Sequence, residues 1–271
     1  MQVTVLGCGG SGGVPLVGGV WGDCDPAEPR NARRRPSILV QTAAGTLLVD
    51  TSPDLRAQLL DAGVDMIDAV LFTHSHADHC HGIDDLRPIV YRRSRPIDAY
   101  GDAATMAALR RRFGYAFASS RPSGAAYDAM LRDRTIEIGA TFELLGLPIT
   151  TFEQRHGAIT TLGYRIGPLG YSPDAAEICA DGFAALAGVD LWIVDCLRYE
   201  PHPSHAHFDR TMDWIRRVAP RRAVLTHMNH MLDYNELAAR CPDGVEPGHD
   251  GMVIQLDARA AAEAPGQPAA E

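Results

Sequence analysis

The feature that most constrains this sequence is a cluster of imidazole and carboxylate side chains at the end of an apolar run. The run Ala69–Phe72 leads directly into the segment THSHADH at residues 73–79, which has the pattern H-x-H-x-D-H. Divalent metals such as zinc and manganese take nitrogen and oxygen ligands of this kind. Alternation along the loop would send the first two histidines to one side and the aspartate and last histidine to another, which suits two metals better than one. The candidate ligands in this segment are His74, His76, Asp78 and His79.

Two metals need further ligands, which we expect on loops that follow other strands. His156 follows an apolar run at residues 149–152, Asp174 follows a short apolar stretch, and His227 follows Ala223–Leu225. Any one of these residues alone could be an ordinary surface or core residue. Because all three occupy positions at strand ends, we predict that they complete the metal site.

The rest of the chain alternates short β-branched runs with helical spacing, which predicts an α/β fold. Strands are predicted at Val3–Leu6, Ile38–Gln41, Thr46–Val49, Ala69–Phe72, Ile149–Phe152, Leu162–Ile166, Leu191–Val194, Ala223–Leu225 and Met252–Leu256. Helices are predicted at Asp54–Ala62, Ala103–Phe113, Phe208–Val218 and Leu232–Arg240. The N-terminal third has the pattern of a β-meander, which argues against a doubly wound parallel sheet. Two packed sheets with helices outside fit this order better.

We expect one domain over residues 1–257, because an α/β chain of 271 residues often forms a single domain. Residues 91–135 are rich in Arg and Ala and poor in strand signal, so a helical excursion is expected there. Residues 258–271 are rich in Ala, Pro and Glu and are expected to form a disordered tail.

Composition excludes several kinds of function. All the basic side chains are arginines, so mechanisms that need a lysine amine are excluded, including the Walker-A phosphate loop and Schiff-base enzymes. A net charge of −9 argues against a nucleic-acid platform, although bound metal could reverse the charge locally. No apolar window predicts a membrane span, and the first residues lack the pattern of a signal peptide, so a cytoplasmic location is expected.

The segment GCGGSG at residues 7–12 satisfies the dinucleotide-binding pattern G-x-G-x-x-G. That pattern needs a helix to begin there, because the helix N-terminus holds the pyrophosphate. Residues 13–19, GVPLVGG, are poor helix formers. We therefore expect a turn whose glycines let the backbone approach the site closely.

Together these motifs resemble the metallo-β-lactamase superfamily over nearly the whole chain. Within it the sequence most resembles the phosphoribosyl cyclic phosphodiesterases of phosphonate degradation, the PhnP-like branch. The segments that carry this likeness are Gly13-Val14-Pro15, Arg34-Arg35-Pro36-Ser37, Leu48-Val49-Asp50-Thr51, Pro201-His202-Pro203-Ser204-His205 and Leu225-Thr226-His227-Met228-Asn229-His230. The resemblance implies a four-layer αββα sandwich of two mixed β-sheets flanked by helices. It also implies a phosphodiesterase acting on a small, cyclic phosphate ester, and a homodimer.

The resemblance assigns roles to particular residues. Two divalent ions, zinc or manganese, would be held by His74, His76 and His156 on one side, by Asp78, His79 and His227 on the other, and by Asp174 between them. Hydroxide shared by the two metals would attack phosphorus, with Asp78 in the catalytic set. His205 is not one of the expected metal ligands and would protonate the leaving group. Asp50 resembles an aspartate that orients metal ligands from behind.

Three other functions stay open from the sequence. A tRNA 3′-end processing endonuclease shares the metal set, but this chain is acidic and has no Gly/Pro-rich arm to grip tRNA. The runs Arg33–Arg35 and Arg110–Arg112 could form local phosphate contacts, although a solvated face is the simpler interpretation of each. The placement of His205 argues against a thioesterase of the hydroxyacylglutathione type. The full ligand set argues against a non-catalytic metal-binding module. The expected partner is therefore a small phosphate ester, with neither nucleic acid nor membrane.

Members of the phosphodiesterase branch often hold a separate structural zinc, and this chain is predicted to lack it. The resemblance places the four ligand positions at Gly19, Trp21, Cys24 and His230, of which only the last two can bind a metal. Structural zinc sites are closed sets of nitrogen and sulfur ligands. We therefore expect two metals and no third, and we expect the large ring of Trp21 to fill the vacated space.

Overall fold

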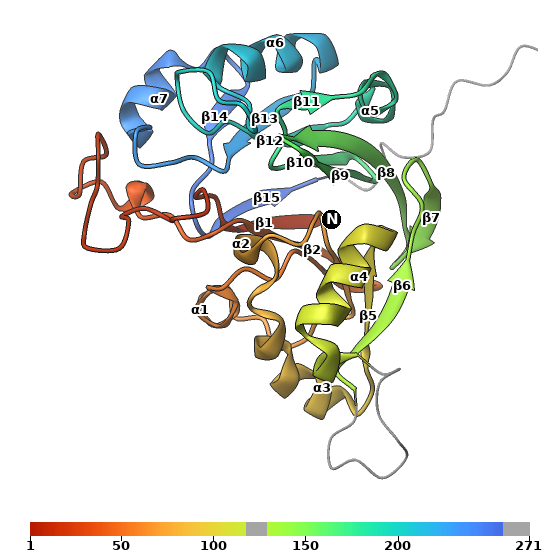
Figure 1. The fold of residues 1–271 in the computed structure, drawn as a ribbon. Helices are drawn as coiled ribbons and strands as arrows, with labels where there is room; N and C mark the ends of the chain where they lie inside the picture. The colour runs from red at the N-terminus through yellow and green to blue at the C-terminus, as the bar shows by residue number, and fades with distance from the viewer. Residues whose placement is uncertain (118–128, 257–271) are drawn as a thin grey trace, which may run out of the picture.

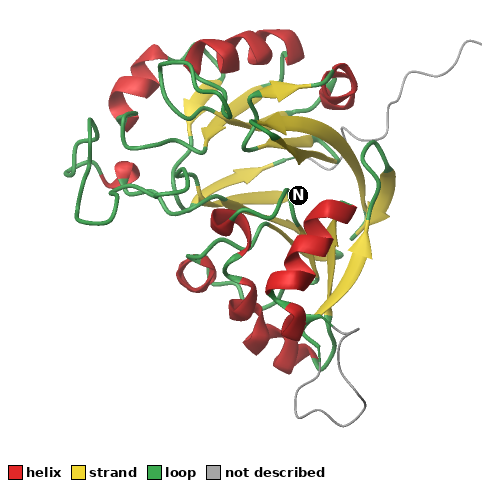
Figure 2. Cartoon of the chain, in the orientation of Figure 1, coloured by secondary structure: helices red, strands yellow, loops and turns green. Residues whose placement is uncertain are grey.

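The computed structural model describes residues 1–117 and 129–256, which form two β-sheets packed face to face with helices on both outer sides (Figures 1 and 2). This arrangement confirms the predicted αββα sandwich. The tail predicted for residues 258–271 lies outside the described residues.

The first sheet is half antiparallel and half parallel. Its strands, in spatial order, are β15 (Met252–Gln255), β1 (Gln2–Gly7), β2 (Ser37–Thr42), β3 (Gly45–Val49), β4 (Ala69–Leu71), β5 (Ile97–Gly101) and β6 (Leu131–Thr135). Strands β15 to β3 pair antiparallel, which confirms the meander, and β3 to β6 pair parallel.

The second sheet is mixed in the same way. Its strands are β11 (Glu177–Ile178), β8 (Leu147–His156), β9 (Ile159–Ile166), β10 (Leu169–Ser172), β12 (Leu191–Asp195), β13 (Arg222–Thr226) and β14 (Val245–Pro247), with β7 (Thr141–Leu144) also paired to β8. Strands β10, β12, β13 and β14 run parallel, so their carboxyl ends meet at one edge of the sheet.

Helices cover the outer face of each sheet (Figure 1). Those on the first sheet's side are α1 (Leu55–Asp61), α2 (Ala77–Cys80), η2 (Ile83–Leu86), α3 (Arg87–Arg93), α4 (Ala103–Arg112) and η3 (Gly114–Ala116). Those on the second sheet are α5 (Ala180–Leu186), α6 (Phe208–Val218) and α7 (Tyr234–Arg240). None of the helices in the described ranges is long and apolar enough to span a membrane.

The sandwich buries the strands on both faces, which explains their continuous apolar runs. In β2, Ile38 and Val40 belong to the core between the two sheets. The residue between them, Leu39, belongs to a second core between the first sheet and its helices. Strand β3 divides in the same way, with Leu47 in the first core and Leu48 in the second.

The helical excursion predicted for residues 91–135 is wrong in part. Helix α4 forms as expected, but β5 and β6 lie in the same segment and extend the first sheet by two parallel strands. Their sequences, IDAYG and LRDRT, contain no apolar run. In β5, which lies between β4 and β6, buried residues alternate with partly exposed ones, whereas most side chains of the edge strand β6 are at least partly exposed. An edge strand of this kind shows little of the hydrophobic pattern by which strands are predicted from sequence.

No helix begins after the glycine-rich residues 7–12, as predicted; the next helical turn is η1 (Pro29–Asn31). The glycines allow close backbone packing. A Cβ on Gly7 would lie 2.1 Å from the Arg35 carbonyl oxygen, and one on Gly9 would lie 2.9 Å from that of Arg33. Any side chain there would push apart the start of the chain and the segment that leads into β2.

A buried arginine lies beside Cys24, one of the two ligand positions that the sequence retains. Trp21 is partly exposed, whereas Arg33 is 2% exposed and its Nη1 lies 3.8 Å from the Cys24 sulfur. The guanidinium also donates to the carbonyl oxygens of Asn229 at 3.1 Å and Leu232 at 2.7 Å. Arginine fits here because its planar fork can satisfy several buried acceptors at once. The lack of a third metal stays a prediction.

Replacing Arg33 with Met should lower the free energy of unfolding by about 2–4 kcal/mol, because the buried carbonyl groups would lose their donors. The matched control is Arg34→Gln, since Arg34 is partly exposed and its side chain pairs with the exposed Asp61. That change should cost less than about 1 kcal/mol. Urea denaturation measures both, and equal losses in the two variants would contradict the assigned role of Arg33.

Candidate active site

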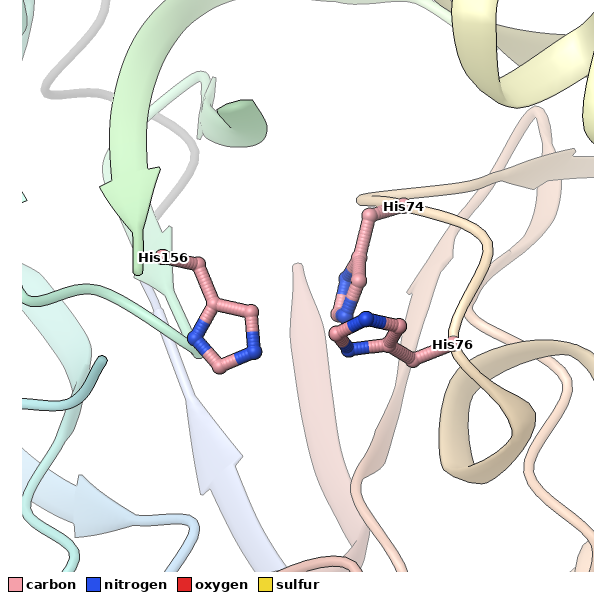
Figure 3. A group of neighbouring side chains, drawn as sticks. All are labelled: His74, His76 and His156. Carbon is pink, nitrogen blue, oxygen red and sulfur yellow. The ribbon is translucent and has the colours of Figure 1, made fainter. Parts of the chain in front are cut away.

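Three histidines, from the ends of strands in the two sheets, face one another (Figure 3). His74 and His76 lie on the loop after β4, and His156 is the last residue of β8. Each offers a ring nitrogen, and these nitrogens lie within 4.8 Å of one another. The close-up shows the His156 ring pointing toward the other two from the opposite wall. Three imidazoles converging in this way can bind one divalent metal.

A second group lies beside the first. Asp78 and His79 come from the short helix α2, Asp174 follows β10, and His227 is the first residue after β13. Their ligand atoms also lie within 4.8 Å of one another, and all four residues are buried. The two groups divide the H-x-H-x-D-H residues as the loop alternation predicted. That they bind metals stays a prediction.

Asp174 faces both groups. Its Oδ2 lies 2.8 Å from His79 Nε2, and its Oδ1 lies 3.3 Å from His227 Nε2. The same Oδ1 lies 3.6 Å from Nε2 of His156 in the first group. A carboxylate that bridges two metals needs this central position.

The backbone is strained at the site. Asp174 and His227 have φ values of 51° and 59°, in the left-handed region that residues other than glycine rarely adopt. Hydrogen bonds hold both turns. Thr161 Oγ1 donates to the Asp174 carbonyl oxygen at 3.1 Å, and the Met228 amide donates to the Cys8 carbonyl oxygen at 2.9 Å. Strain of this kind costs about 1–3 kcal/mol per residue and persists where the surroundings over-determine it, commonly at functional sites.

Ligand orientation comes from acceptors behind the rings. Asp50, after β3, accepts a hydrogen bond from His79 Nδ1 at 2.7 Å, as expected for a residue that orients a ligand. It also accepts from the amide and the hydroxyl of Thr73, both at 2.8 Å. His156 Nδ1 donates to the Ser204 carbonyl oxygen at 2.7 Å. With Nδ1 occupied, Nε2 of each ring is the atom left to face the site.

The charges of the two groups suit a cation. Burial lowers the pKa of His74, His76 and His156, which favours the neutral form that a metal ligand needs. Burial acts in the same direction on His79 and His227, but the nearby carboxylates, Asp174 foremost, raise the pKa of His79 well above its usual value and that of His227 to about 9.

An unpaired buried nitrogen also indicates a cation site. His74 Nε2 is buried and makes no hydrogen bond within the described parts of the chain. A buried polar atom without a partner is costly, and a cation would satisfy it. The donor set, imidazole nitrogens with carboxylate oxygens, therefore fits divalent zinc or manganese.

His205 lies on the loop before α6, beside Asp174. Its Nδ1 is 3.0 Å from Asp195 Oδ2 and 3.8 Å from Asp174 Oδ1. Asp195, the last residue of β12, is completely buried and also accepts hydrogen bonds from the amides of Ala175 at 2.9 Å and Ala206 at 3.3 Å. The sequence analysis missed Asp195, although it ends a strand as the other site residues do. His205 also lies within ligand distance of His156 and Asp174, so its proximity alone does not separate it from the ligands.

Comparisons with known proteins agree with this geometry. A family model described as the beta-lactamase superfamily domain matches residues 46–228. A crystal structure described as a new diphosphatase from the PhnP family has 31% sequence identity and a TM-score of 0.85, and the match covers 94% of this chain and 98% of that one. The chain belongs to the PhnP family of the beta-lactamase superfamily.

Curated relatives carry more varied names. An octanoyltransferase of Porphyromonas gingivalis is 33% identical over 260 residues, which cover 95% of this chain and 52% of that protein. A ribonuclease Z of Methanopyrus kandleri is 28% identical over 147 residues, which cover 52% of this chain and 46% of that protein. The chain thus spans about half the length of the curated relatives it matches. Their activities are properties of those longer proteins.

Replacing Asp174 with Ala should reduce metal content as well as turnover, because its carboxylate faces both ligand groups. Asp50→Ala is the comparison, since Asp50 contacts a ligand from behind; its loss should cost about 10–100-fold in metal affinity or activity. Elemental analysis of the purified variants measures the difference. Two metals per chain in Asp174→Ala would assign the bridging position to another residue.

Proposed function

We propose that this protein is a metal-dependent phosphodiesterase that hydrolyses a small, cyclic phosphate ester of the phosphoribosyl or cyclic nucleotide type. The observation that carries the proposal is His205, paired with a buried aspartate at the edge of a ligand set suited to two metals. An alkoxide leaving group must be protonated, whereas a thiolate can leave without a proton. A placed proton donor therefore favours a phosphate ester over a thioester.

Two divalent ions, zinc or manganese, would be held by the two ligand groups with Asp174 between them. When bound, they would supply a nucleophile at neutral pH and stabilise charge on the phosphoryl oxygens.

The chain's own contribution lies on the leaving-group side. Asp195 accepts the hydrogen bond from His205 Nδ1, which fixes the orientation of the ring. The opposite nitrogen, Nε2, is then the atom that donates a proton to the leaving oxygen. Because Asp195 also accepts from Ala175 and Ala206, one carboxylate sets the spacing between the Asp174 loop and the His205 loop.

The comparisons support phosphorus as the reacting centre. The 31%-identical member of the family is called a diphosphatase, and curated relatives are called ribonuclease Z. The first name makes a diphosphate linkage the second candidate substrate. A tRNA substrate is disfavoured, because a net charge of −9 opposes binding to a long polyanion.

Turnover assays with and without chelator test the proposal. Bis(p-nitrophenyl) phosphate and a nucleoside 2′,3′-cyclic phosphate should be hydrolysed by the metal-loaded protein, and chelator should abolish both reactions. A nucleoside diphosphate ester tests the second candidate, and S-lactoylglutathione tests the thioesterase. Faster turnover of the thioester than of either phosphodiester would contradict the proposed function.

Replacing His205 with Ala should keep the metals and lower the turnover of substrates with alkoxide leaving groups by about 10²–10⁴. The loss should be smaller with bis(p-nitrophenyl) phosphate, because p-nitrophenolate needs little protonation. His207→Ala is the control, since His207 precedes α6 and caps no amide with its side chain. Wild-type turnover of a poor leaving group by His205→Ala would refute the assignment and make His202 the next candidate.

A further inference from the structure

A small cavity lies beside the helices that cover the second sheet. It is bounded by β11, α5 and α6 and has a volume of about 330 Å³ (Figure 1). This volume is at the lower end of the range for pockets that hold small organic ligands. None of the candidate metal ligands lines the cavity, and neither does His205. The side chains that the argument uses are Glu177, Phe183, Arg210, Trp214 and Arg217.

Two aromatic rings in the cavity are open to a ligand. Phe183 of α5 and Trp214 of α6 meet edge to face, with their ring centroids 6.4 Å apart. Both residues are partly exposed, so a ligand can reach them. The guanidinium carbon of Arg217 lies over the Phe183 ring, 3.7 Å from its centroid. This cation–π contact holds the guanidinium against an apolar surface that a second ring can extend.

The two arginines of the cavity have no carboxylate partner. Among the described residues, no ion pair within 4.0 Å includes Arg210, Arg217 or Glu177. The neighbouring Arg216, in contrast, pairs with Asp213. In a chain with a net charge of −9, two unpaired guanidinium groups in one cavity reverse the local charge and favour an anion.

Arg210 also has a structural contact, which Arg217 lacks. The Nη1 atom of Arg210 donates to the Ala176 carbonyl oxygen at 2.7 Å. Ala176 lies just after the turn that carries Asp174, so Arg210 supports the candidate active site from outside. Arg217 makes no hydrogen bond to any other residue in the described parts of the chain, and a guanidinium has five N–H donors. Arg217 is therefore the main anchor that the cavity offers to an anion.

We propose that this cavity is a binding site for a small aromatic carboxylate. The carboxylate accepts two hydrogen bonds from the planar fork of Arg217, while its ring packs against Trp214. Two guanidinium groups and the Glu177 carboxylate leave one net positive charge in the cavity, which matches a monoanion better than a doubly charged phosphate. The site contains none of the candidate metal ligands, so the inference does not depend on the proposed function.

Isothermal titration of the full chain with indole-3-acetate and indole-3-acetamide tests the proposal. The two compounds have the same ring and differ in the charge of the side group. The wild type should bind the carboxylate about tenfold more tightly than the amide, as one charge-assisted contact at an exposed site allows. Arg217→Gln should remove that preference, Arg217→Lys should keep part of it, and added salt should weaken it.

Two further variants separate the ring from the charge. Trp214→Leu should weaken the binding of both compounds, because both present the same ring to the cavity. Arg216→Gln is the matched control, since it removes the next charge on the same helix, and it should leave the preference unchanged. Thermal unfolding of each variant checks that it folds as the wild type does. Unchanged affinities in Trp214→Leu would contradict the role given to the ring.

A carboxylate that bound to metal in the candidate active site would give a different result. The preference for the carboxylate would then persist in Arg217→Gln, and the proposal would be wrong. Equal affinity of the wild type for the two compounds, or no measurable binding of either, would also overturn it. Turnover plays no part in the measurement, so this proposal and the proposed function fail separately.

Discussion

The two halves of the sandwich meet at one buried carboxylate. Asp174 comes from the second sheet and lies 2.8 Å from His79, whose helix follows a strand of the first sheet. On its other side it faces His227 and His156 of its own sheet. A carboxylate this deeply buried is tolerable only where positive charge compensates it, whether imidazolium or metal. The site can therefore form only when both sheets have packed correctly.

Hydrogen bonds from the surrounding residues hold the site side chains in this arrangement. Asp50, at the end of a strand in the first sheet, fixes His79, and Asp195, at the end of a strand in the second, fixes His205. Both aspartates are completely buried, and each accepts hydrogen bonds from backbone amides as well as from a ring. Fixed dipoles and charges of this kind cost no reorganisation during a reaction, which is why an active site benefits from them.

The part of the chain around residues 8–35 stabilises the site from outside. Its glycines allow the backbone to pack against the segment before β2. The amide of Gly10 donates to the Met228 carbonyl oxygen and the amide of Met228 donates to that of Cys8, which ties this segment to the His227 turn. Arg33 then ties this segment to the loop just after that turn through the carbonyl oxygens of Asn229 and Leu232. A buried side-chain cation thus joins two segments about 200 positions apart in sequence.

Much of the candidate metal site could be predicted from the sequence because its signals are local. Four candidate ligands lie within six residues after an apolar strand, and the other three follow strands that are apolar themselves. The alternation of the loop was enough to divide the first four between two groups. Strands buried on both faces were equally visible, whereas β5 and β6 were missed because neither carries an apolar run. Buried residues alternate with partly exposed ones in β5, and most side chains of the edge strand β6 are at least partly exposed.

Only the tertiary structure decided the contacts between distant segments. Asp195 looked like an ordinary residue at the end of a strand until folding placed it against His205 and Ala175. Arg112 belonged to a run of three arginines, and only packing of α4 against the ligand loop set it apart from Arg110. The sequence by itself determined which residue types could bind metal and on which strand ends they lie, since those depend on spacing and hydrophobic pattern. Which of its charged side chains became buried partners, and which stayed exposed, depended on long-range packing that spacing does not encode.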